Sequence, residues 1–217
     1  MAAPDAPDAP DAREREVRRL LDRYIQEVVE AYDLCPWARA ARTGGEVAAA
    51  VLWGTPPIDA WIAAATELLA RPETRVAMVV APELAASPAE LRAIRSDVAA
   101  RVAIAGVADF HPDAPLDLAT PARLVPFLRR SPDPLLQLVP HAILSSVRTP
   151  QPRYATLDQL HLLTGGGAAP KPDIADRIAA TNHARVSRDG AALEAKLAEL
   201  RADRAASYAR VGISACR

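Results

Sequence analysis

Cys35 is the residue whose chemistry and setting stand out most, because Pro36 follows it directly after a long amphipathic segment. We expect Cys35 to cap a short new helix with Pro36 at the first helical position. The helix amides and dipole would then favour the thiolate. Arg39 and Arg42, four and seven residues further on, would lower the pKa of the thiol further or bind an anionic substrate. The competing interpretation is a small, buried, apolar cysteine.

His111 is the second candidate, because it follows a short apolar stretch and precedes Pro112 and Asp113. An imidazole at the end of a strand, oriented by a nearby carboxylate such as that of Asp113, is suited to acid or base catalysis. The competing interpretation is a histidine that only closes the strand end through hydrogen bonds.

Arg130 and Ser131 form a third group of polar side chains in the run Arg129-Arg130-Ser131-Pro132. Guanidinium groups in a constrained turn suit a carboxylate or a phosphate, although solvated surface arginines are the simpler explanation. Beside Cys35, Trp37 is counted as a candidate substrate contact, and core packing is its alternative role.

Alternating helices and strands must position these groups. Ser87, Pro88 and Glu90 have the spacing of an N-cap, a first-turn proline and a capping-box glutamate. Apolar periodicity predicts helices over residues 13–33, 58–70 and 87–103, and strands over 46–53, 75–81 and 106–110. This order predicts an α/β fold, a small mixed or parallel sheet flanked by helices, with reactive side chains at strand ends.

The second half of the chain is more interrupted. We expect a proline-rich loop over 113–134 that contains a short helix at 122–129, then a strand at 135–139 and a helical turn at 141–147. Two helices, 173–184 and 190–210, would form a peripheral C-terminal extension. The expected organisation is a disordered tail (1–12), an α/β core domain (13–150), and a linker with C-terminal helices packed on the core (151–217).

Composition excludes several classes of protein. The formal net charge of −1 over 217 residues argues against electrostatic recognition of nucleic acid. Two cysteines cannot form a disulfide framework, and no apolar run approaches the roughly 20 residues that span a bilayer. Neither Cys-x-x-Cys nor His-x-x-x-His spacing occurs, which disfavours a conventional zinc site. We therefore expect a cytoplasmic protein without nucleic-acid or membrane partners, and leave oligomerisation open.

Three short segments together resemble the bacterial and plant domain-of-unknown-function family 1415. They are Leu34-Cys35-Pro36-Trp37-Ala38, Phe110-His111-Pro112-Asp113, and Arg130-Ser131-Pro132 before Leu135-Leu136-Gln137-Leu138. The similarity covers roughly residues 17–147 and implies a shared fold without an established reaction. It also places Cys35, His111, Asp113, Arg130 and Ser131 at motif positions. Phenylalanine at position 37, asparagine at 129 and an aromatic residue at 133 are usual in that family, so this chain would be a divergent member.

Three functions remain open. The first is a small-molecule enzyme with Cys35 as nucleophile or redox thiol, His111 as acid or base, and Arg42 or Arg130 holding an anionic substrate. The second is a haem or iron oxidoreductase ligated by His111 or Cys35. The third is a non-catalytic partner-binding module. The first function requires Cys35 and His111 to lie within hydrogen-bonding distance of each other.

Overall fold

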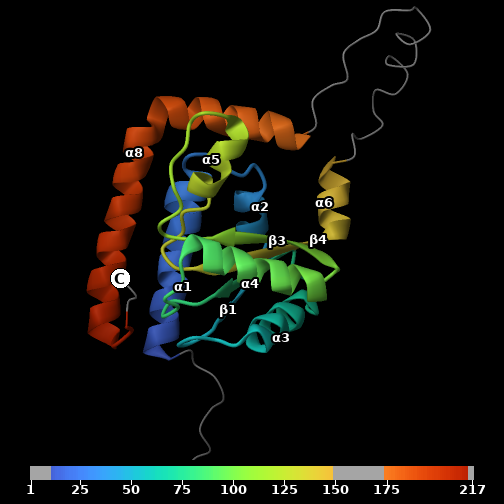
Figure 1. The fold of residues 1–217 in the computed structure, drawn as a ribbon, viewed down its shortest axis with the longest axis vertical. Coiled ribbons are helices and arrows are strands. Elements are labelled where there is room, and N and C mark those ends of the chain that lie inside the picture. Colours follow the sequence, from blue (N-terminus) through green and yellow to red (C-terminus); the bar gives the residue numbers. More distant parts are fainter. Residues whose placement is uncertain (1–10, 149–173, 215–217) are drawn as a thin grey trace, which may run out of the picture.

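The computed structural model describes residues 11–148 and 174–214, in which a four-stranded sheet lies between two layers of helices (Figure 1). The predicted α/β class, with a small mixed sheet and a C-terminal helical part, is confirmed. The predicted linker at 151–173 lies outside the described residues.

In chain order the elements are α1 (Ala12–Tyr24), the π-helix η1 (Ile25–Glu30), α2 (Ala38–Thr43), β1 (Val47–Val51), α3 (Ile58–Leu69), β2 (Val76–Val80), α4 (Pro88–Arg101), β3 (Ala105–Phe110), α5 (Pro121–Leu128), β4 (Leu135–Pro140), α6 (His141–Arg148) and α8 (Ile174–Val211).

The strand order of the sheet is β1-β2-β4-β3. β1 and β2 are parallel, and β4 is antiparallel to both of its neighbours, β2 and β3. β2 and β3 therefore run in the same direction on either side of β4. As a consequence, the loops that follow β2 and β3 lie at the same edge of the sheet as the loop that leads into β4. We call this edge the carboxyl edge.

Both faces of the sheet are buried. Along β2, Met78 and Val80 pack with α1, α5 and α8 in one apolar cluster, whereas Ala77 and Val79 pack with α3 and α4 in the other. This alternation follows from the two-residue repeat of side chains along a strand. It explains why residues 75–81 form a near-continuous apolar run, as expected of a strand covered on both sides.

The first and fourth helices largely match their sequence signals. Ser87 accepts a hydrogen bond from the Glu90 amide while the Glu90 carboxylate accepts one from the Ser87 amide, so the predicted capping box of α4 is confirmed. The first helix begins earlier than expected, because Asp11 caps it and Ala12 is its first residue. Those two residues were assigned to a disordered tail, which is wrong for them; residues 1–10 lie outside the described part.

The C-terminal region differs from the prediction. Instead of two peripheral helices, α8 is one helix of 38 residues. Figure 1 shows that it bends, so that its first part crosses near α5 and its second part runs beside α1. The described side chains Val186, Leu193, Leu197 and Tyr208 are buried in the same cluster as α1. α8 is therefore part of the core rather than an extension of it.

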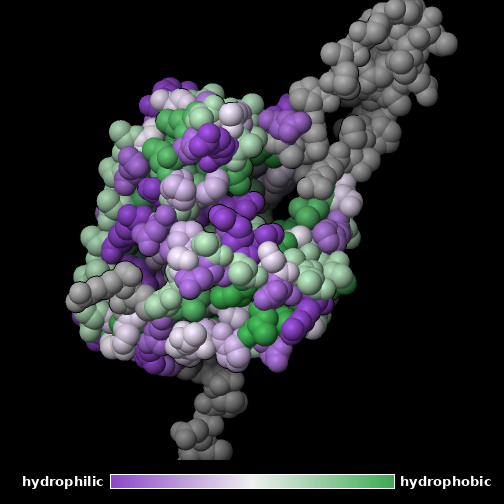
Figure 2. All heavy atoms as spheres, viewed as in Figure 1, coloured by the Kyte–Doolittle hydropathy of each residue, from purple (hydrophilic) through white to green (hydrophobic). Residues whose placement is uncertain are grey.

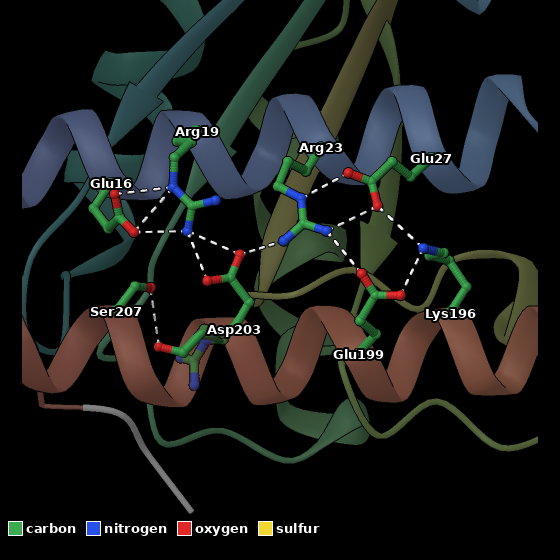
Figure 3. Close-up of polar contacts among 9 residues, drawn as sticks. Glu16, Arg19, Arg23, Glu27, Lys196, Glu199, Asp203 and Ser207 are labelled. Atoms are coloured by element: carbon green, nitrogen blue, oxygen red, sulfur yellow. Dashed lines mark hydrogen bonds and ion pairs between the residues drawn. The ribbon is translucent and has the colours of Figure 1, made fainter.

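An ion-pair network joins α8 to α1 along their exposed sides (Figure 3). Asp203 of α8 pairs with both Arg19 and Arg23 of α1, and Arg23 also contacts Glu27 at 2.7 Å and Glu199 at 3.1 Å. Glu16 lies 2.7 Å from Arg19 at one end, and Lys196 lies 2.6 Å from Glu199 at the other. The network fixes the second part of α8 along α1, and thereby sets where the other side of α8 lies.

The surface offers little that resembles a large apolar interface on the face shown in Figure 2, where hydrophilic and hydrophobic residues are intermixed. Within the described ranges, none of the helices combines the length and the apolar character that crossing a bilayer requires.

Candidate functional site

A pocket of about 530 Å³ lies at the carboxyl edge of the sheet. Three loops and one helix form its walls: the loop from β2 into α4, the loop after β3, the loop before β4, and the second part of α8. A volume of this size is typical of sites for small molecules. The residues that line it are Leu84, Ala85, Ala86, Ser87, Pro88, His111, Pro112, Asp113, Pro132, Pro134, Arg201 and Arg204. We call it the carboxyl-edge pocket.

His111 connects two walls of this pocket. Its side chain is buried, with Nε2 2.7 Å from the Ala86 carbonyl oxygen, and its Nδ1 accepts a hydrogen bond of 3.0 Å from the Asp113 amide. These partners assign the proton of a neutral imidazole to Nε2. Both ring nitrogens are therefore engaged with backbone groups. The expected acid or base role for His111 is not supported, because neither nitrogen is left to exchange a proton with a ligand and the Asp113 contact comes from its amide.

Asp133, Arg204 and Tyr208 form a buried polar network behind the pocket. Asp133 accepts hydrogen bonds of 2.6 Å from Arg204 Nε and 2.5 Å from the Tyr208 hydroxyl. Burial raises the pKa of the Asp133 carboxyl, and the charge and hydrogen bonds of its two partners oppose that shift. Burial, followed by the nearby Asp133, also raises the pKa of Tyr208. Arg204 donates further to the Pro82 carbonyl at 2.9 Å, so the network ties α8 to two loops of the carboxyl edge.

Arg201 lies one helical turn before Arg204 on the same side of α8 and is exposed at the pocket. Its Nη2 donates to the backbone carbonyl of Pro112. Among the described residues, no carboxylate forms an ion pair with Arg201, whereas Arg204 pairs with Asp133. A guanidinium group has five N–H donors, and the bond to Pro112 occupies one of those of Arg201. Arg201 is a cation whose remaining donors are available to a ligand.

Arg130 and Ser131 lie close to this pocket but face the protein. Arg130 Nε donates to the Ala114 carbonyl, and its guanidinium lies 4.7 Å from the centre of the Phe127 ring. Burial and then the charge of Arg201 lower the pKa of Arg130, and the carboxylates of Glu194, 3.6 Å away, and of Asp113 oppose this shift. The Ser131 hydroxyl is buried and donates to the Asp133 carbonyl. Ser131 therefore shapes the loop and does not point to a ligand.

Cys35 lines a different pocket, of about 340 Å³, beside the end of η1. Trp37, and not Cys35, is the N-cap of α2, so the predicted capping role is wrong. Burial raises the pKa of the Cys35 thiol; the amides of Trp37 and Ala38 oppose this, and the neighbouring Asp33 adds to it. The net result is a thiol with less thiolate at neutral pH than an ordinary cysteine, the reverse of what we expected.

The arginines expected to assist Cys35 are paired with Glu30 instead. Arg42 Nε lies 2.6 Å and Arg39 Nε 3.4 Å from the Glu30 carboxylate, which is itself buried. The hydrogen bond from Arg42 holds the pKa of Glu30 below its ordinary value. Trp37 is 40% exposed and does not belong to the core. This region is therefore an ion-paired turn rather than an anion site.

The structure thus divides the predicted site residues into two groups. His111, Asp113, Arg130 and Ser131 gather at the carboxyl edge, whereas the second group surrounds the end of η1: Cys35, Trp37, Arg39 and Arg42. Cys35 and His111 line different pockets and no hydrogen bond joins them. A joint Cys35/His111 centre is not formed, because the seven-residue segment between η1 and α2 and the end of β3 line separate pockets.

His111, as it is placed, does not fit a role as a haem or iron ligand. Ligation by His111 would require breaking the bond to Ala86 or the bond to the Asp113 amide. In the ranges 11–148 and 174–214, no three side chains of His, Cys, Asp or Glu come close enough together to hold one metal ion. Ligation by His111 therefore has no support from its hydrogen bonds, and a site made of three such protein ligands is not present in these ranges.

Sequence reasoning missed four residues of the carboxyl-edge site: Asp133, Arg201, Arg204 and Tyr208. The last three recur at steps of three and four residues, which places them on one side of a helix. That spacing was the available signal. It was hidden because the region also carries many ordinary surface charges.

Comparison with known proteins adds no relative: the protein-family models, the curated proteins and the solved structures that were searched contain no match to this chain. The resemblance to domain-of-unknown-function family 1415 remains a prediction from the three short segments.

Proposed function

We propose that this protein binds a small molecule through an anionic group in the carboxyl-edge pocket, with Arg201 as the principal charged contact. One observation carries the proposal: Arg201 lines the pocket and has no carboxylate partner among the described residues. A guanidinium with free donors binds carboxylates and phosphates through charge-assisted hydrogen bonds.

The other polar groups of the pocket are already engaged, which directs the anion to Arg201. Arg204 is bound to Asp133 and to the Pro82 carbonyl, and His111 is bound through both ring nitrogens. The start of α4 also faces the pocket, but the Glu90 carboxylate already occupies that positive end of the helix. A second anion placed there would meet a like charge.

The proposal concerns ligand binding and not thiol chemistry, because Cys35 lines the other pocket. The proposal keeps one part of the sequence-based hypothesis, an anionic small molecule bound by an arginine. The arginine is Arg201 of α8 in place of Arg39, Arg42 or Arg130.

Isothermal titration calorimetry on the full chain tests the proposal, with inorganic phosphate and succinate as probes. We expect saturable binding of at least one probe. In Arg201→Gln the affinity should fall about 10- to 100-fold, since a hydrogen bond to a charged group contributes roughly 1.5–3 kcal/mol. The matched control is Arg210→Gln, an exposed arginine on the same helix that does not line the pocket. Absence of binding, equal affinity in Arg201→Gln, or an equal loss in Arg210→Gln would contradict the proposal.

A further inference from the structure

Asp113 is the second charged group of the carboxyl-edge pocket that forms no ion pair with a described residue. Its amide bonds to His111, but its carboxylate forms no hydrogen bond or ion pair with any described residue. The residue is exposed and lines the same pocket as Arg201. The loop after β3 therefore presents to the pocket a carboxylate whose charge acts on Arg130 but which forms no direct ion pair with it.

Arg201 and Asp113 come close without pairing. The Arg201 guanidinium donates to the carbonyl of Pro112, the residue immediately before Asp113, and yet no ion pair forms between the two side chains. Elsewhere on α8, arginines that approach carboxylates do pair with them, as Arg204 does with Asp133 and Arg185 with Asp33. The pocket thus holds one cation and one anion that are both open to a ligand.

We propose that the ligand of this pocket carries a cationic amine or guanidine as well as its anionic group, the anion pairing with Arg201 and the cation with Asp113. This inference rests on the proposed function. A ligand that is only anionic would place its charge near the Asp113 carboxylate, and the two like charges would repel. A cationic group on the same molecule replaces this repulsion with an attraction.

The apolar lining of the pocket indicates which kind of chain links the two charged groups of the ligand. Leu84, Pro88, Pro132 and Pro134 contribute apolar surface to the pocket. A short aliphatic chain packs against such walls with less cost than a polar one. The chemical class that meets all three conditions is a small aliphatic amino acid.

Calorimetry on the full chain with matched pairs of probes tests this inference. The pairs are glycine with acetate, 3-aminopropanoate with propanoate, 4-aminobutanoate with butanoate, and 5-aminopentanoate with pentanoate. We expect at least one amino acid to bind ten times or more tightly than its matched acid. Asp113→Asn should reduce this preference to about one, and the affinity for the acid should stay the same or rise, because the like charge is removed. Asp97→Asn, an exposed aspartate of α4 outside the pocket, should keep the preference.

The outcomes separate this inference from the proposed function. If the acids bind and lose affinity in Arg201→Gln, but no amino acid is preferred, the proposed function stands and the zwitterionic ligand is wrong. Persistence of the preference in Asp113→Asn overturns the inference as well. If neither the acids nor the amino acids bind, both the inference and the proposed function fail. A circular dichroism spectrum of Asp113→Asn checks that the variant folds, which we expect because the bond to His111 uses the backbone amide.

Discussion

The hydroxyl group of Tyr208 donates a hydrogen bond of 2.5 Å to Asp133, a residue 75 positions earlier in the chain. Both side chains are buried. Through this bond and the Arg204–Asp133 ion pair, α8 is held against the loop that leads into β4. The position of Arg201 at the pocket depends on this attachment, since Arg201 lies on the same side of the same helix.

Removing the Tyr208 hydroxyl should destabilise the fold. In Tyr208→Phe the Asp133 carboxyl loses one of two side-chain partners in a buried site, and we expect the free energy of unfolding to fall by about 1–3 kcal/mol. Tyr24→Phe is the matched control, because the Tyr24 hydroxyl is also buried but has no hydrogen-bond partner in the described part of the chain. That variant should be neutral or slightly stabilising. Urea denaturation measures both, and equal effects in the two variants would refute the role given to the Tyr208–Asp133 bond.

The ion-pair network between α1 and α8 should make stability depend on salt and on pH (Figure 3). Burial raises the pKa of Asp203, but the hydrogen bonds from Arg19 and Arg23 outweigh it, so the pKa lies below its ordinary value. The hydrogen bonds from Arg19 and Arg23 likewise lower the pKa of Glu16 and of Glu27. A carboxylate with a lowered pKa stabilises the fold above its pKa in the unfolded chain, and this contribution is lost as the pH falls through the folded value.

Asp203→Asn isolates this effect. At neutral pH and low salt we expect a loss of about 1 kcal/mol in unfolding free energy, the upper end for partly exposed pairs. The difference from the unmodified chain should shrink in 1 M NaCl and below about pH 4, near the ordinary aspartate pKa. Asp189→Asn is the control on the same helix, because within residues 11–148 and 174–214 Asp189 forms its ion pair with its neighbour Arg188 and none with α1. A difference that grows toward acid pH would show that the sign is wrong.

Cys35 should react slowly with alkylating reagents at neutral pH. The thiolate is the reactive species, and burial raises the pKa of this thiol. In a Cys216→Ser background, the rate of iodoacetamide labelling should rise with pH and reach its half-maximal value above about 8.5, the ordinary thiol value. Trp37→Ala should leave the pH at half-maximal labelling close to this, since the amide of residue 37 remains. A half-maximal rate near pH 7 would restore the activated thiol expected from the sequence.

The sequence predicted those helices and strands well whose formation depends on residues close together in the chain. The capping box of Ser87 and Glu90 and the apolar run that forms β2 are examples, because helix ends and buried strands are specified by short stretches of chain. The prediction of a break before Gly190 was wrong. A glycine costs a helix roughly 1 kcal/mol relative to alanine, and here the burial of Val186 and Leu193 on either side of it outweighs that cost.

The site depends on contacts between distant parts of the chain, which is why half of it was missed. His111 and Asp113 were identified from their place after an apolar strand, but Arg201 reaches them only because α8 folds back along α1. The spacing of Arg201, Arg204 and Tyr208 places them on one side of a helix, but it does not show that this side faces His111 and Asp113. Cys35 was assigned a thiolate because Pro36 suggested a helix start, and the helix instead begins after Trp37.

A two-dimensional ¹H–¹⁵N NMR titration of the full chain with 4-aminobutanoate and succinate tests the central claim most directly. The account predicts that saturating shifts concentrate on the backbone amides of the carboxyl-edge pocket, namely those of Ala86, Ser87, Asp113 and Arg201, and weaken in Arg201→Gln. Shifts confined to residues 30–39 around Cys35, or shifts that are unchanged in Arg201→Gln, would contradict it.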